Sequence, residues 1–413
     1  MGLFNRYKFG SRVLRMGMRG PDVLKLQACL RERGYDIPHE ETYFGYLTRE
    51  ALQEFQRDYR LAVDGVAGKT VFALLRQEKL PITRIIHNVA PGETIAEIAE
   101  EYGVGVEAFS ASNRIHRLYP GQRLVFFDRE VWAMASEVPA DGANLTGTLI
   151  PFDLSGEEGT TPVALGKKSI LALYTSEEDE LLWIHHQLCT PLRRKRLAER
   201  VRELAQGSGG VCFCFEHLSR VDGARYLAFL KRVRRVLGSH QRLMVQLGPR
   251  IPRRGLTSGV DFPALSRVVD RVVVQLSLPT APGPILDRRR AEKALWPLMR
   301  EINGWQMLLR IPMYAMLWNL TDPQQPPAHL PSQEAVAKLY RHSARIRREE
   351  GPFYLFTEKG VEYHLRLVQR EAFSQVVALV NLHNLAGVVL DRLGMEDPRL
   401  WPVLRSHFRT THF

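Results

Sequence analysis

The clearest chemical pattern in the sequence is an alternation of Cys212, Cys214 and Glu216 in the stretch GVCFCFE. Residues at a period of two project from the same side of a β-strand. A carboxyl group at the end of such a strand is costly to bury unless it is solvated or paired, so we expect Glu216 to face a ligand, and a purely structural role is the alternative. Two thiols beside a carboxylate could hold a metal ion, but small inert core thiols are the preferred interpretation, and we predict neither a metal nor a cofactor.

Two aromatic side chains form a second group of candidate ligand-binding residues. Tyr314 and Trp318 belong to the stretch IPMYAMLW, close to the end of a predicted strand. Their rings could stack on the apolar face of a sugar, because aromatic rings combine a large apolar surface with a polar tip. The alternative, that both rings pack in the protein core, is equally consistent with the sequence.

The elements that must position Glu216 are short apolar runs that alternate with helical stretches over residues 145–413. Such alternation predicts a parallel α/β sheet, and about eight repeats predict a (β/α)8 barrel of the TIM type. The stretch that leads to SILALYT is short, so we expect the first units of the barrel to be incomplete. Catalytic groups of such barrels lie at the carboxyl ends of the strands, which is where Glu216 stands.

Two smaller segments precede this region. In residues 12–76, apolar residues recur at helical spacing in three short stretches separated by Gly-rich turns, which predicts a small all-α bundle of three helices. Residues 85–127 predict a strand, two helices and a strand, with Thr94 capping the first helix after a Pro-Gly turn. We therefore expect a multidomain protein with a three-helix domain at 12–76, a βααβ domain at 85–127 and a barrel at 145–413.

Both small segments resemble domains that bind bacterial cell walls. The stretches RMGMRGPDVLKLQ, YFGYLTREALQEFQRDYRLAVDG and VAGKTVFALL resemble the peptidoglycan-binding type 1 domain. The elements PGET, YGV, SASN and YPGQRL resemble a LysM domain, which implies binding of N-acetylglucosamine-containing glycans in a shallow groove. Asn113 could instead cap a helix, and Tyr119 could pack in the core. The positions that the LysM resemblance assigns to the groove are Gly92, Glu93, Thr94, Asn113, Ile115, Leu118 and Tyr119.

Residues 145–413 resemble family 18 glycoside hydrolases of the LysM-bearing spore-germination type, through GGVCFCFE, RVVVQLS, IPMYAMLW, FYLFTEKGVEYHL and LAGVVLDRLGMEDPRLW. The resemblance implies that Glu216 protonates the leaving oxygen while the acetamido oxygen of the substrate attacks the anomeric carbon. It also implies partner groups that this chain has replaced. The replaced positions are Gly209, Cys212 and Cys214 on the fourth strand, Ser277 and Leu278 on the sixth, and Asp391 at the end of the eighth.

These replacements fall on the groups that would stabilise the transition state. The family has an Asp in place of Cys214 to orient the acetamide, and a Tyr-Asp pair in place of Ser277 and Leu278 to hold its oxygen. Asp391 stands where a Trp would form the floor of the sugar subsite. Together the losses would remove most of the electrostatic preorganisation on which the mechanism depends.

The composition is that of a folded chain attracted to polyanions. The 413 residues are 45% hydrophobic, and 57 Lys and Arg against 45 Asp and Glu leave a net charge of +12. No zinc-ligand spacing or aromatic RNA-binding motif accompanies this charge, so nucleic acid is not the expected partner. The spacing of the four cysteines predicts no disulfide framework, and no apolar stretch has the length of a membrane span or an export signal. We expect the protein at the spore surface, cortex or coat, or otherwise associated with the cell wall.

Two functions are consistent with these features. The first is a peptidoglycan-binding protein whose family 18-like barrel has an impaired catalytic constellation. The second is an active peptidoglycan N-acetylglucosaminidase of the cortex-lytic type that uses Glu216 as its general acid. The sequence leaves open whether the chain is an enzyme, and it makes no prediction of the oligomeric state.

Overall fold

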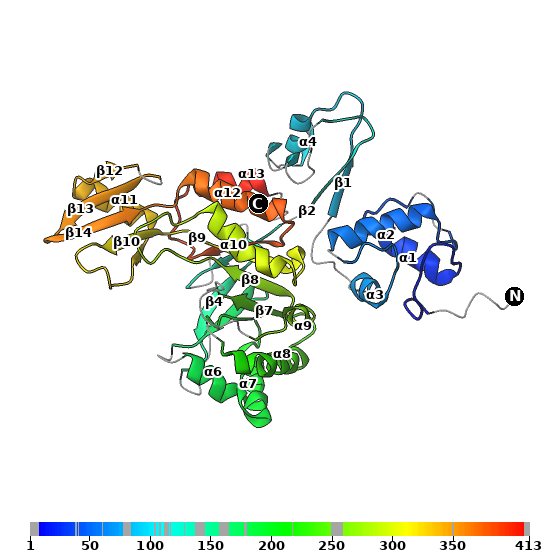
Figure 1. Ribbon diagram of the computed structural model, residues 1–413, viewed down its shortest axis with the longest axis horizontal. Helices are drawn as coiled ribbons and strands as arrows, with labels where there is room; N and C mark the ends of the chain where they lie inside the picture. Colours follow the sequence, from blue (N-terminus) through cyan, green and yellow to red (C-terminus); the bar gives the residue numbers. More distant parts are fainter. Residues whose placement is uncertain are drawn as a thin grey trace. The chain divides into compact units, whose positions relative to one another are not determined.

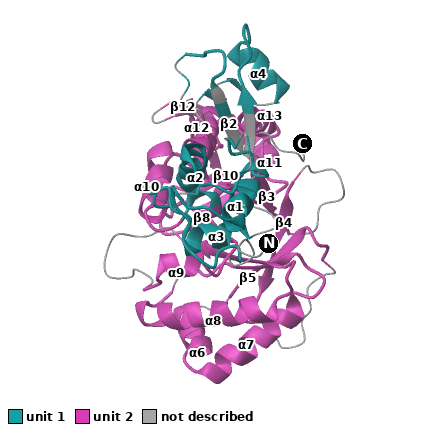
Figure 2. Ribbon diagram, turned by 90° about the vertical axis from the view of Figure 1, so that its right-hand side faces the viewer, with its two compact units in different colours: residues 1–128, 303–305 teal, residues 129–302, 306–413 magenta. Residues whose placement is uncertain are grey.

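The computed structural model describes residues 8–408 except for 38, 40, 60, 77–83, 103–104, 107–108, 111–114, 116, 128, 137–144, 157–164, 177–179, 217, 249–258 and 349–350. The chain divides into two compact units (Figure 2). The first comprises Met1–Asp128 and Asn303–Trp305, and the second comprises Arg129–Ile302 and Gln306–Phe413.

The first domain is a bundle of three helices, α1 (Pro21–Arg31), α2 (Tyr46–Asp58) and α3 (Lys69–Leu75). Its core consists of the apolar side chains that recur at helical spacing in the sequence. Buried Gln27 ties α1 to the chain before α2, because its amide donates to Thr48 Oγ1 at 2.8 Å and to the Tyr43 carbonyl at 2.9 Å. The predicted three-helix domain is confirmed.

The second domain contains the antiparallel strands β1 (Arg84–Asn88) and β2 (Arg123–Phe127), with helix α4 (Ile95–Glu101) between them. Residues 106, 109 and 110 are helical where a second helix is predicted. Thr94 begins α4 with a capping box: its hydroxyl accepts from the Glu97 amide, and the Glu97 carboxylate accepts from the Thr94 amide at 2.8 Å. The βααβ arrangement and the predicted N-cap agree with the sequence analysis.

Eight parallel strands close into a barrel in which the first strand pairs with the last (Figure 1). The predicted barrel is therefore confirmed, but it begins before the predicted boundary at residue 145. Its first strand has the sequence EVWAM, which is too short to show a clear apolar period. In chain order the strands are β3 (Glu130–Met134), β4 (Gly147–Asp153), β5 (Ser169–Tyr174), β6 (Gly210–Phe213), β7 (Arg242–Leu247), β8 (Arg271–Gln275), β9 (Met307–Pro312) and β15 (Gly387–Asp391).

Helices cover the outer face of the barrel along most of its circumference (Figure 1). The described residues between β3 and β4, and those between β4 and β5, contain no helix. Because residues 137–144 and 157–164 lie outside the described part of the chain, the expected incompleteness of the first units remains a prediction. The helices are α6 (Glu180–Leu188), α7 (Pro191–Leu204), α8 (Gly223–Val236), α9 (Phe262–Ser266), α10 (Arg288–Met299), α12 (Arg370–Leu382) and α13 (Leu400–His407), with short 3-10 turns η1 (Arg220–Asp222) and η2 (Gly304–Gln306).

The interior of the barrel is filled by side chains from the alternate positions of its strands. Trp132, Cys212, Met244, Leu308 and Val389 belong to this inner cluster and are almost fully buried. The other face of each strand packs against the surrounding helices. The interior is thus a packed core, and polar groups can gather only where the strands end.

An antiparallel sheet of five strands is inserted between β9 and α12, in the order β11-β10-β14-β13-β12. This insertion was not predicted as separate from the barrel units, because its strands alternate with a helix as the barrel strands do. Its elements are β10 (Ala315–Asn319), β11 (Ala328–Leu330), α11 (Ser332–Arg341), β12 (Arg345–Arg347), β13 (Phe353–Glu358) and β14 (Val361–Arg366).

His364 in β14 should make the stability of this inserted sheet depend on pH. Its ring stacks on Phe353 with 4.4 Å between centroids, and Arg366 Nε donates to its Nε2 at 3.1 Å. Burial and the Arg366 charge lower the pKa of His364 from 6.5 to about 4. The folded state thus binds fewer protons than the unfolded state between these values, and we expect stability to fall by about 2–3 kcal/mol from pH 7 to pH 4.

Chemical unfolding of the protein at a series of pH values measures this effect. His364→Gln should remove the corresponding part of the pH dependence, because the amide oxygen can still accept from Arg366 but does not titrate. The exposed His240 supplies the control His240→Gln, which should leave the profile unchanged. Identical profiles for wild type and His364→Gln would contradict the assignment.

Candidate functional site

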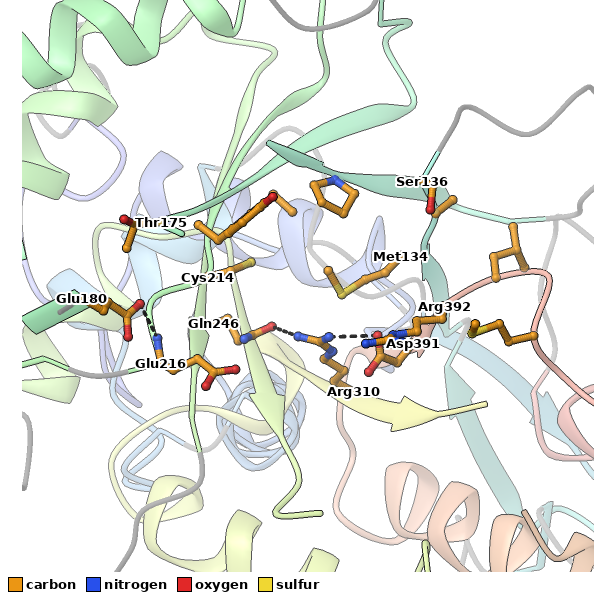
Figure 3. Close-up of a pocket in the computed structure, with 16 residues that line it drawn as sticks. Met134, Ser136, Thr175, Glu180, Cys214, Glu216, Gln246, Arg310, Asp391 and Arg392 are labelled. Carbon is orange, nitrogen blue, oxygen red and sulfur yellow. Dashed lines mark hydrogen bonds and ion pairs between the residues drawn. The ribbon is translucent and has the colours of Figure 1, made fainter. Parts of the chain in front are cut away.

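A cavity of about 740 Å³ opens at the carboxyl ends of the barrel strands (Figure 3). The carboxylates of Glu180 and Glu216 lie toward one end, while the guanidinium groups of Arg310 and Arg392 lie toward the other. This is the place where barrels of this kind hold their ligands. The remaining lining residues are Met134, Ala135, Ser136, Pro151, Ala172, Tyr174, Thr175, Cys214, Gln246, Asp391, Leu393 and Met395.

Glu216 lies in the wall of this cavity, three residues beyond the end of β6. Its backbone N–H donates to Glu180 Oε1 at 3.0 Å, and Glu180 is the first residue of α6. The Glu216 side chain is exposed, and its carboxylate makes no hydrogen bond or ion pair with any residue that the structure describes. The predicted acid is thus free to meet a ligand, while its role as a general acid remains a prediction.

The two cysteines of the alternating motif differ in their access to the cavity. Cys212 is fully buried inside the barrel, whereas Cys214 contributes to the cavity wall, and their sulfur atoms are 3.8 Å apart. The hydrogen bond from Cys214 and burial raise the pKa of Cys212, so its thiol stays protonated. Among the residues that the structure describes, no group of three or more His, Cys, Asp and Glu side chains could hold a metal ion.

Three of the predicted motif positions do not reach the cavity. Gly209 precedes the first residue of β6, and a Cβ atom there would lie 2.2 Å from the Lys167 carbonyl oxygen, so an Asp does not fit without a backbone shift. Ser277 is exposed, and its carbonyl accepts from Arg290 at 3.3 Å. Leu278 packs against the outer core of the barrel. Gly209 lies before the start of β6, and Ser277 and Leu278 lie beyond the end of β8, so none of the three lines the cavity, and their assignment as altered motif positions remains a prediction.

Asp391 ends the last barrel strand, where the sequence analysis places it, and it forms an ion pair in the cavity. Arg310 Nη2 donates to Asp391 Oδ1 at 2.8 Å, and Arg310 Nη1 donates to Gln246 Oε1 at 2.7 Å. Gln246 in turn donates to Gln275 Oε1 at 2.8 Å. Although burial acts to lower the pKa of Arg310, the charge of Asp391 and the hydrogen bond to it raise that pKa, so the guanidinium stays charged.

Arg310 and Gln246 were not predicted as site residues, although one sequence signal indicates the arginine. Arg310 is a lone charged residue in the apolar strand sequence MLLRIP. Arginine is almost never buried without a partner, so its presence there indicates a paired group at the strand end. Asp391 is the partner.

The two predicted sugar-stacking rings belong to the core. Tyr314 is 1% exposed, stacks on His329 with 4.2 Å between centroids and donates to Asp391 Oδ2 at 3.4 Å. Trp318 is 3% exposed and donates to the Thr280 carbonyl at 3.1 Å. Neither ring lines the cavity, so the alternative of core packing holds for both. The aromatic ring in the cavity wall is that of Tyr174, at the end of β5.

In the βααβ domain, Glu93 and Thr94 serve the local fold. Glu93 Oε2 accepts from the Ala90 amide at 2.6 Å and lies 2.9 Å from His87 Nε2, and these hydrogen bonds lower the pKa of Glu93. The Thr94 hydroxyl is the helix cap. Gly92 has φ +91° in the turn before them, a conformation that favours glycine.

The remaining predicted groove residues differ in exposure. Ile115 and Leu118 are half-buried against the domain core. Tyr119 is 54% exposed, and the Arg117 guanidinium lies 5.5 Å from its ring centroid. Asn113 lies outside the described residues. Tyr119 is therefore the predicted residue whose ring is accessible to a glycan, and the role of the whole set remains a prediction.

Comparison with protein families identifies the two small domains. Residues 19–75 match the putative peptidoglycan binding domain, and residues 87–127 match the LysM domain. The chain carries both modules. None of the described helices has the length and apolar character needed to cross a membrane.

The similar proteins include enzymes of bacterial spores. A spore cortex-lytic enzyme of Oceanobacillus iheyensis is 38% identical over 64 residues, which cover 16% of this chain and 23% of that protein. The putative sporulation-specific glycosylase YdhD of Bacillus subtilis is 20% identical over 368 residues, covering 76% of this chain and 86% of YdhD. The chain thus spans less than a quarter of the length of the first of these relatives.

Among solved structures, the spore cortex-lytic enzyme SleL of Bacillus megaterium superimposes with a TM-score of 0.58 at 18% identity, over 79% of this chain and 87% of SleL. At this identity the likeness establishes the fold. It agrees with the predicted order of a peptidoglycan-binding domain, a LysM domain and a barrel.

Proposed function

We propose that this chain binds peptidoglycan of a bacterial spore or cell wall through its two N-terminal domains, and that its barrel holds an N-acetylglucosamine-containing glycan without efficient hydrolysis. The matches to the peptidoglycan-binding and LysM models support the first part. The cortex-lytic and sporulation-specific relatives support a target in the spore cortex or wall. Two modules of modest affinity on one chain gain avidity on a polymer that repeats its epitope.

The arrangement of charge around Glu216 carries the second part. Hydrolysis of this type develops positive charge at the sugar, and a nearby carboxylate must stabilise that charge. The position two residues before Glu216 holds Cys214, which has no carboxylate. The Asp391 carboxylate is already neutralised by Arg310, whose guanidinium would itself repel a cationic intermediate in the cavity.

Incubation of the full chain with insoluble peptidoglycan tests this proposal. We expect the protein to sediment with the polymer while mass spectrometry of the soluble fraction detects no new reducing ends. Glu216→Gln should behave as the wild type does, because the residue is not used for turnover. Failure of the wild type to sediment would contradict the binding function.

The alternative is an active N-acetylglucosaminidase, and the free carboxylate of Glu216 in the cavity is the observation that favours it. In that case new reducing ends should accumulate with wild-type protein and disappear with Glu216→Gln. That result would overturn the proposal of an impaired barrel, while sedimentation with the polymer would still support the binding domains.

A further inference from the structure

One cationic side chain of the cavity has no polar partner in the described protein. Arg392 follows directly after β15, is exposed and lines the cavity. Its guanidinium carbon lies 5.0 Å from the centroid of the Tyr314 ring, which gives the group a platform. The guanidinium makes no hydrogen bond or ion pair with any residue that the structure describes, so its donors are available to a ligand.

The backbone at Arg392 is held in an unfavourable conformation. Its φ of +62° lies in the left-handed region, where a side chain with a Cβ atom is disfavoured. The following turn is anchored, because the Leu393 amide donates to the Met134 carbonyl at 2.7 Å and the Met395 amide donates to the Arg392 carbonyl at 3.2 Å. Strain of this kind, kept by the surrounding structure, is typical of residues that contact ligands.

Neighbouring charges do not neutralise Arg392. The adjacent carboxylate of Asp391 accepts from Arg310 and from the Tyr314 hydroxyl. The other carboxylates of the cavity, Glu180 and Glu216, lie toward its opposite end (Figure 3). The cavity therefore presents a positive end formed by Arg392 and a negative end formed by Glu216.

We propose that Arg392 binds the carboxylate of an acidic amino sugar, such as N-acetylmuramic acid with a free lactyl group. This inference rests on the proposed glycan-binding cavity and names the class of sugar that the cavity takes. A guanidinium can donate two parallel hydrogen bonds to a carboxylate, and such a pair is strengthened where water is partly excluded.

Calorimetric titration of the full chain with matched ligands tests the proposal. N-acetylmuramic acid and N-acetylglucosamine differ by one lactyl group, so the ratio of their affinities isolates the contribution of the carboxylate. We expect N-acetylmuramic acid to bind about tenfold more tightly, the difference contributed by one charged hydrogen-bonded pair. Glucuronic acid, which carries its carboxylate on the ring, should bind less tightly than N-acetylmuramic acid if the lactyl group is the source.

Arg392→Gly is the decisive variant. Glycine adopts a φ of +62° without strain, so the variant should fold at least as stably as the wild type while the affinity ratio falls to about one. Lys359→Gly is the matched control, because Lys359 is an exposed cation with φ +51° in the β13–β14 turn and does not line the cavity. This control should leave the ratio unchanged.

The outcomes separate this inference from the proposed function. If N-acetylglucosamine binds and N-acetylmuramic acid does not bind more tightly, the carboxylate assignment is overturned while the proposed binding of N-acetylglucosamine-containing glycan by the chain stands. If neither sugar binds the wild type, both proposals for the barrel fail. Lactate that binds as tightly as N-acetylmuramic acid would show an adventitious anion only and would also overturn the assignment, as would an unchanged ratio in Arg392→Gly.

Discussion

Glu130→Ala should lower the free energy of unfolding of the barrel by about 3–5 kcal/mol, because it removes the carboxylate that forms an ion pair with a buried guanidinium. Glu130 begins the first barrel strand, at the end remote from the cavity. Its carboxylate accepts from Arg271 Nη2 at 2.6 Å, from Arg242 Nη1 at 3.0 Å and from Trp132 Nε1 at 2.8 Å. Arg271 is 4% exposed, so water cannot replace the lost carboxylate.

The same carboxylate should give the barrel a characteristic loss of stability in acid. Burial acts to raise the pKa of Glu130, but the charges of Arg271 and Arg242 outweigh it and lower the pKa from 4.5 to about 2. The ionised Glu130 carboxylate therefore contributes its full share to the free energy of unfolding above pH 4.5, and this share is lost as the pH falls toward 2. The shift in the pKa of Glu130 corresponds to about 3 kcal/mol. Glu130→Gln should lack this part of the acid transition.

Urea unfolding followed by circular dichroism, at neutral pH and in the acid range, measures both effects. Glu203 supplies a matched control, because its carboxylate is 65% exposed and lies 3.9 Å from Arg202. Glu203→Ala should change stability by less than about 0.5 kcal/mol. A loss of similar size in both variants would show that the Glu130 cluster has no special role.

Arg310→Met, at the other end of the barrel, should lower the free energy of unfolding by a similar amount, about 3–5 kcal/mol. The variant leaves the Asp391 carboxylate buried and unpaired. Asp391 is 6% exposed, and its remaining described hydrogen bond is the 3.4 Å contact from Tyr314. Gln246 also loses the donor to its side-chain oxygen. If the free energy of unfolding falls by only a few tenths of a kcal/mol, solvent in the cavity already screens the ion pair between Arg310 and Asp391, and the prediction is wrong.

A double-mutant cycle separates the pair from the rest of the network. Arg310→Met combined with Asp391→Leu removes both charges, and replacement of a buried ion pair by apolar groups is often close to neutral. We therefore expect the double variant to be more stable than either single variant. Strict additivity of the two single losses would contradict direct coupling between Arg310 and Asp391.

Much of the fold was predictable because its determinants are local. The helices of the first domain follow apolar residues at helical spacing, and the cap at Thr94 follows from the residue type before the helix. The barrel follows from repeated alternation of apolar runs and helices. The five residues of β3 were missed, because a strand this short carries no period that distinguishes it from a loop.

The candidate site was predictable only in part. Glu216 and Cys214 were placed in the cavity from their strand register, and Asp391 was placed at the end of the last strand. Gly209, Ser277 and Leu278 were carried over from a family motif, and they lie outside the cavity, Gly209 before the start of its strand and the other two beyond the end of theirs. Tyr314 and Trp318 were ambiguous, because an aromatic residue near a strand end has the same local pattern whether it is buried or exposed.

The sequence by itself determined the order of the domains, the class of each fold and the position of the strand that carries Glu216. Those properties depend on periodicity and turn residues within a few tens of positions. The pairing of Arg310 with Asp391, the network of Glu130 with Arg271 and the unpaired Arg392 beside Tyr314 were decided only by the tertiary structure. Closure of the barrel brings together residues that are about 80 to 140 positions apart in the sequence. The electrostatic energy of each charged side chain depends on the partner that it meets there and on how far water is excluded around the pair.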